Sequence, residues 1–76
     1  MTMHMKLLPS DLWMQQIFDA KAARQGGVVR RKLRDVERNV GLDLILREIR
    51  RRGYHAIENS GQVVIFCNTV PIQVLC

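Results

Sequence analysis

The fold of this chain is decided by residues 42–67, which read LDLILREIRRRGYHAIENSGQVVIFC. Leu42, Ile45, Leu46 and Ile49 recur at the three- and four-residue spacing of one helix face. Arginines fill positions 50 to 52 ahead of Gly53, and cations in a last helical turn followed by glycine are a strong stop signal. The segment therefore predicts a helix that begins at Leu42 and ends just before Gly53.

Two apolar runs follow this helix, at residues 54–58 and 62–67, and predict two strands. The turn residues Asn59–Gly61 lie between them and predict a hairpin, because glycine takes the positive φ that such turns need. Beyond Pro71, the alternation in Ile72–Cys76 predicts a third strand at the sheet edge, where proline is tolerated. The second run is apolar on both faces, so we expect helices to cover one face and a partner chain the other.

Upstream of this segment, Ser10 is expected to cap a helix that ends at Gly26-Gly27. Residues 28–40 place their apolar side chains on one narrow helical stripe, which favours a second helix. Cations at its start would face the positive end of the helix dipole. This leaves open an alternative, in which Val28–Arg31 is extended and the helix begins nearer Leu33; the helix is the first expectation and the extended segment the second.

These segments predict an α+β fold: an N-terminal helix, a basic helical middle broken at Gly41, then a three-stranded antiparallel sheet. A chain of 76 residues is short enough to form one domain, expected at residues 10–76 after an N-terminal extension at residues 1–9. So small a domain buries only about 60% of its unfolded surface and is marginally stable alone. We therefore expect a homodimer.

Positive charge is concentrated in the middle of the chain. Residues 21–52 hold eleven basic and four acidic side chains, a net charge of +7, whereas each flanking segment has a net charge of −1. A field of this kind favours an anionic partner, either nucleic acid (DNA or RNA) or an acidic protein surface. Arginine is suited to bidentate phosphate contacts. The candidate phosphate-binding residues are Arg30, Arg31, Arg34, Arg38, Arg47, Arg50 and Arg51.

Other functional classes have little support in the composition. The charge-free stretch after Ser60 is interrupted by polar residues, and residues 1–14 lack the apolar centre of a secretory signal. We therefore expect a cytoplasmic protein with no membrane partner, in which Cys67 and Cys76 are reduced thiols. Two cysteines and two histidines without ligand spacing predict no metal and no cofactor.

One pair of residues raises the alternative of a small hydrolase. With a three-residue loop at Asn59–Gly61, His55 would lie diagonally across from Cys67 on one face of the sheet, at about 7 to 8 Å between backbones. A thiolate activated by a histidine is a nucleophile. With a two-residue loop, the register flips and the two side chains lie on opposite faces.

The run Val36–Gly41, followed by Leu42–Arg52 and Gly53-Tyr54, resembles the helix-turn-helix of winged-helix DNA-binding proteins. In that family a helix ends in an apolar residue and glycine, the next helix reads the major groove, and a hairpin wing follows. Three features depart from the family. Glu37 stands where a small residue is usual, and the apolar residues Ile45 and Ile49 come one residue early after Gly41. The expected wing is also apolar, at Val63–Cys67. The resemblance implies duplex DNA binding.

Leu42–Cys67 is also similar to the HicA family of small RNA-cleaving toxins, which have a sheet like that of double-stranded-RNA-binding domains. That family carries its histidine after Gly-Ser near the turn, whereas this chain has Gly61-Gln62. RNA cleavage is therefore not carried over.

Residues 18–76 resemble a group of short bacterial proteins, some labelled phosphoribosylanthranilate isomerase. The shared patterns are Gln25–Arg31, Asp35–Arg38, Arg51–Tyr54, Glu58–Gln62 and Phe66–Asn68. The isomerase is a barrel of about 250 residues, so we treat the label as a naming artefact. The sequence predicts a small non-catalytic nucleic-acid-binding or regulatory module, with a protein-interaction module as the alternative.

Overall fold

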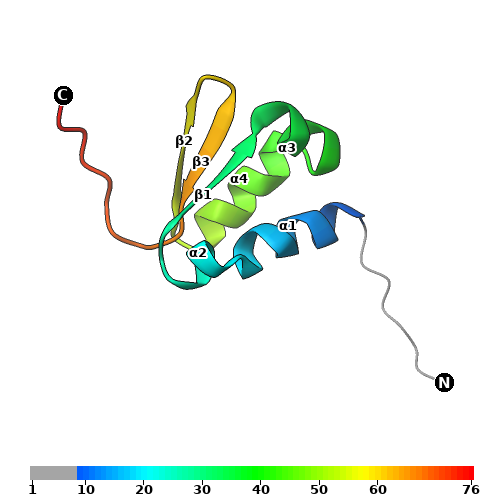
Figure 1. Ribbon diagram of the computed structural model, residues 1–76, viewed down its shortest axis with the longest axis horizontal. Coiled ribbons are helices and arrows are strands. Elements are labelled where there is room, and N and C mark those ends of the chain that lie inside the picture. The colour runs from blue at the N-terminus through cyan, green and yellow to red at the C-terminus, as the bar shows by residue number, and fades with distance from the viewer. Residues whose placement is uncertain (1–8) are drawn as a thin grey trace.

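The computed structural model describes residues 9–76, so the predicted N-terminal extension lies outside it except for Pro9. Helices and a three-stranded antiparallel sheet form the predicted α+β fold, with every helix on one side of the sheet (Figure 1). The elements are α1 (Pro9–Asp19), α2 (Lys21–Arg24), β1 (Val28–Lys32), α3 (Leu33–Asn39), α4 (Leu42–Arg51), β2 (His55–Asn59) and β3 (Gln62–Phe66). No helix within residues 9–76 is long and apolar enough to cross a membrane.

The N-terminal helix differs in detail from its prediction. It begins at Pro9, so Ser10 lies inside the first turn and is not the N-cap. Proline is well suited to a first turn because its missing N–H has no partner there in any case. The helix ends at Asp19 and the short α2 follows, so the predicted single helix up to Gly26 is two helices.

The segment Val28–Lys32 is strand β1, which makes the extended alternative correct and the helical one wrong. The strand pairs antiparallel with β3, with Val29 opposite Ile65 and Arg31 opposite Val63. Val29 is buried in the core, while Arg30 on the other face is exposed. The strand keeps Arg30, Arg31 and Lys32 out of the first turn of α3, which starts at Leu33 with Lys32 as its N-cap residue.

Ile72–Cys76 does not form the predicted third strand. The sheet order is β1-β3-β2, so β1 already occupies the second edge of the central strand. The tail leaves the sheet after Phe66 and runs away from the body of the fold (Figure 1). Val74 and Leu75 in this tail are 85% and 90% exposed.

The hairpin between β2 and β3 has a two-residue loop. Asn59 pairs with Gln62, which leaves Ser60 and Gly61 as the loop, with φ of 51° and 74°. Positive φ at both loop residues is typical of the type I′ turn, whose twist matches that of the flanking strands. The predicted glycine turn is confirmed, and its loop has two residues, not three.

The core lies between the helices and one face of the sheet. Ile45 and Ile49 of α4 pack there with Val36 of α3 and Ile65 of β3, and none of these side chains is more than 3% exposed. The apolar stripes read from the sequence thus meet over the central strand. Because the apolar face of α4 packs against the sheet, its opposite face, which carries the arginines, points outward.

Candidate nucleic-acid interface

The turn between α3 and α4 is fixed by contacts within the turn itself. Gly41 has φ of 97° and ψ of 132°, and its amide donates to the carbonyl of Val36 at 2.8 Å. The carboxylate of Glu37 accepts a hydrogen bond from the amide of Leu42 at 2.8 Å. Glu37 thereby satisfies one of the free amides at the start of α4, which gives a reason for glutamate at this position. A two-residue turn, Val40-Gly41, joins the two helices.

The outward face of α4 carries two arginines that make no ion pair within residues 9–76. Arg47 and Arg50 are exposed, one turn apart, while Ile45 and Ile49 face the core. Arg50 also lines a groove of about 560 Å³ between α4 and β2, together with Tyr54. Exposed guanidinium groups without acidic partners keep their N–H donors free for an anionic ligand.

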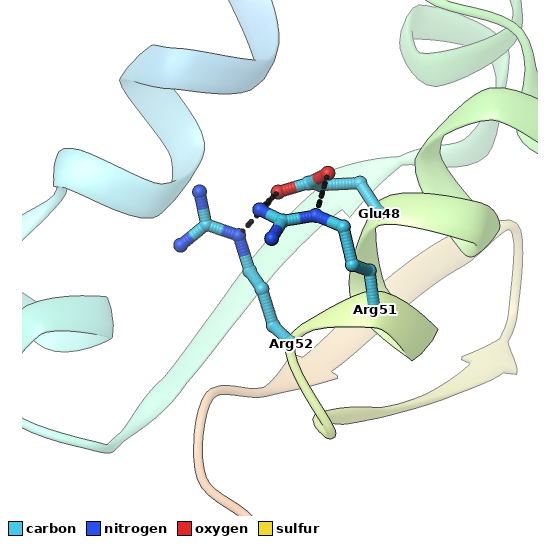
Figure 2. A network of polar contacts seen from close by, with 3 residues as sticks. All are labelled: Glu48, Arg51 and Arg52. Carbon is cyan, nitrogen blue, oxygen red and sulfur yellow. Dashed lines mark hydrogen bonds and ion pairs between the residues drawn. The ribbon is translucent and has the colours of Figure 1, made fainter.

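Arg51 and Arg52, by contrast, are bound to one carboxylate. Glu48 accepts from Arg51 Nε at 3.0 Å and Nη2 at 2.6 Å, and from Arg52 Nε at 2.6 Å (Figure 2). The guanidinium of Arg52 also lies over the ring of Phe18 in α1, 4.1 Å from its centroid. This network joins the end of α4 to α1, so it has a structural role. The phosphate-binding role predicted for Arg51 competes with this ion pair.

The two hydrogen bonds from Arg51, followed by the one from Arg52, lower the pKa of Glu48 from 4.5 to about 2. An acid with a depressed folded-state pKa stabilises the fold above its unfolded pKa and loses that effect as the pH falls towards the folded value. Glu48→Gln is therefore expected to lower the free energy of unfolding by roughly 1 to 2 kcal/mol at pH 6, after allowing for the exposure of Arg51. Urea unfolding at pH 6, 4 and 2.5 should show the two proteins converging as the pH falls.

Asp19→Asn provides the control, because it removes the same charge from the exposed end of α1 and leaves the arginines untouched. A constant difference between Glu48→Gln and the parent protein from pH 6 to pH 2.5 would contradict the depressed pKa.

The arginines of α3, Arg34 and Arg38, are exposed as well. Arg34 and Arg38 approach one oxygen of Asp35 at 4.0 and 3.7 Å, and both side chains are more than three-quarters exposed. Ion pairs of this length and exposure contribute little. We name Arg34, Arg38, Arg47 and Arg50 the helix surface.

Arg30 and Arg31 do not join the helix surface, because they lie on β1. Arg31 is on the core side of the sheet and donates to the carbonyl of Arg30 at 2.7 Å. Arg30 projects from the opposite side, where Lys32 accompanies it at two-residue spacing. Lys32 was not among the predicted residues. The period-two alternation of a strand, applied to Val28–Lys32, would have identified it.

His55 and Cys67 are not brought together. His55 pairs with Phe66, which places it on the side of the sheet away from the helices. Cys67 is buried in the core on the other side, and burial raises the pKa of its thiol. The hydrolase alternative therefore lacks its nucleophile pair. Within residues 9–76, no three His, Cys, Asp or Glu side chains gather as a metal site either.

The hairpin does not project as a wing. Lys32, the last residue of β1, pairs with Gln62 at the hairpin tip, and the amide of Leu33 donates to the carbonyl of Gly61 at 2.8 Å. The tip of the hairpin therefore lies beside the start of α3 and does not extend beyond it. Comparisons of the chain with protein-family models, curated proteins and solved structures find no match.

Proposed function

We propose that this protein is a small non-catalytic module that binds duplex DNA through its helix surface. The observation that carries the proposal is the pair Arg47 and Arg50, exposed on the outward face of the second helix of a helix-turn-helix and without an acidic partner in residues 9–76. In such motifs the second helix enters the major groove and the first lies against the backbone. Arg47 and Arg50 would contact base edges or phosphates, and Arg34 and Arg38 the flanking phosphates.

The shape of the major groove supports DNA rather than RNA as the duplex. The major groove of B-form DNA admits a helix, whereas that of A-form RNA is too deep and narrow for side chains to read. The hairpin, which ends level with α3, leaves the outward face of α4 free for a groove.

The proposal is tested by measuring the salt dependence of binding. The double variant Arg47→Gln/Arg50→Gln removes two expected phosphate or base contacts from α4. Because each phosphate contact adds about 0.9 to the slope of log K against log salt concentration, the slope should fall by up to about 1.8. Fluorescence anisotropy of a labelled 16-base-pair duplex between about 50 and 200 mM salt measures this.

The matched control is Lys21→Gln/Arg24→Gln, which removes two exposed cations from α2. Its slope is expected to stay close to that of the parent protein. If both double variants reduce the slope equally, the binding follows net charge and the helix surface is not the site. If the parent protein does not bind the duplex at about 50 mM salt, the proposal fails and an acidic protein surface becomes the target of the arginines.

The homodimer stays a prediction. It is supported by the tail, where Val70, Val74 and Leu75 expose apolar side chains. Apolar residues gathered on an exposed segment are typical of protein contacts. A symmetric dimer would present two copies of α4 to successive turns of one duplex.

A further inference from the structure

The side of the sheet away from the helices carries its own set of basic, aromatic, amide and apolar side chains. Strand register places nine residues on this face, and none of them is acidic. They are Val28, Arg30, Lys32, His55, Ile57, Asn59, Gln62, Val64 and Phe66. Every helix lies on the other side of the sheet, so this face is not covered by any of them (Figure 1). We call these nine residues the sheet surface.

Two rings form one end of the sheet surface. His55 and Phe66 are register partners on adjacent strands, which places their Cβ atoms about 5 Å apart. Phe66 is outside the core cluster and lines a groove of about 430 Å³ with residues of the tail, among them Asn68 and Gln73. An aromatic side chain at the wall of an open groove provides a stacking surface for a flat ligand.

The cations form the other end. Arg30 and Lys32 are both exposed, and neither makes an ion pair within residues 9–76. Along the strand direction, Arg30 lies about 7 Å and Lys32 about 14 Å from the paired residues Val28 and Phe66. Gln62 and Asn59, which pair with each other beside Lys32, add exposed amide donors and acceptors.

We propose that the sheet surface binds single-stranded nucleic acid, with a base stacked on Phe66 and the backbone held by Arg30 and Lys32. The charge of this face is complementary to a phosphate backbone, because its cations lie among residues that include no carboxylate. Rings and apolar side chains suit bases that are unstacked, and a duplex hides those base faces. This extends the proposed function to a second ligand on a separate surface, since Arg30 and Lys32 do not belong to the helix surface.

The test compares a labelled 12-nucleotide oligouridylate, the corresponding oligothymidylate and the 16-base-pair duplex by fluorescence anisotropy. Phe66→Leu keeps an apolar side chain and removes the ring. Since stacking of one base contributes about 1 to 3 kcal/mol, we expect single-strand binding to weaken roughly tenfold or more, with duplex binding unchanged. Arg30→Gln/Lys32→Gln should reduce the single-strand salt slope by about 1.4.

The two proposals fail independently. Arg47→Gln/Arg50→Gln is expected to reduce duplex binding while retaining single-strand binding at the level of the Lys21→Gln/Arg24→Gln control. If the parent protein does not bind the single strand, the sheet-surface proposal is wrong. It is also wrong if Phe66→Leu is folded, as thermal unfolding shows, and binds the single strand as tightly as the parent protein. Either result leaves the duplex proposal standing. A dimer that dissociates in Phe66→Leu, detected by sedimentation velocity, also overturns the sheet-surface proposal, because a second copy would then cover this face.

Discussion

Ile45→Ala is expected to lower the free energy of unfolding by about 3 kcal/mol, because it opens a cavity at the centre of the core. Ile45 is 0% exposed and lies where α4 packs on Val36 and Ile65. A domain of this length has a total stability of roughly 4 to 11 kcal/mol, so this single loss is a large fraction of it. The melting temperature should fall by more than about 10 °C.

The adjacent residue provides the control. Leu44 is 38% exposed on the outward side of α4, so Leu44→Ala removes an apolar side chain of the same size and leaves little cavity. Its expected cost is below about 1 kcal/mol. Urea unfolding followed by circular dichroism measures both variants. Equal losses would mean that α4 does not pack on the sheet through Ile45.

Gly41→Val is expected to cost about 2 to 3 kcal/mol through the backbone alone. The φ of 97° at Gly41 lies in a region that β-branched residues rarely adopt. A Cβ atom built at this position meets nothing within 4 Å, so no clash contributes to the cost. The strain would act at the turn of the helix-turn-helix, where the Val36 and Glu37 contacts set the direction of α4.

Urea unfolding of Gly41→Val and Gly41→Ala measures how the backbone strain depends on the side chain. Alanine should cost less than valine, because its single methyl group tolerates positive φ better than a branched side chain. A Gly41→Val protein as stable as the parent would contradict the strained turn. Lower duplex affinity in the folded variant would connect the turn to the orientation of Arg47 and Arg50.

Some elements of this fold could be predicted from the sequence because their signals are local. The periodicity of α4 and the cations before Gly53 determine that helix within one stretch of chain, and the structure confirms it from Leu42 to Arg51. The hairpin follows in the same way from two apolar runs around a glycine turn. The break at Gly41 is confirmed too, because glycine there takes a backbone conformation that other residues avoid.

The register of the hairpin could not be predicted, because loops of two and three residues both fit Asn59–Gly61. Ser60 adopts positive φ, so the loop has two residues, and this one-residue difference puts His55 and Cys67 on opposite faces. The segment that forms the third strand could not be predicted either. Ile72–Cys76 alternates as a strand should, but a strand placed next to β3 needs a free edge of β3, and β1 and β2 occupy both.

The sequence by itself determined that the positive charge lies in residues 21–52 and that α4 presents arginines opposite its apolar stripe. Only the tertiary structure decided how those arginines divide. Val28–Lys32 has patterns compatible with both helix and strand, and pairing with β3 across the sheet selects the strand. Because side chains of a strand alternate between its two faces, Arg30 and Lys32 are separated from the helix surface, and the basic middle of the chain becomes two surfaces on opposite sides of one sheet.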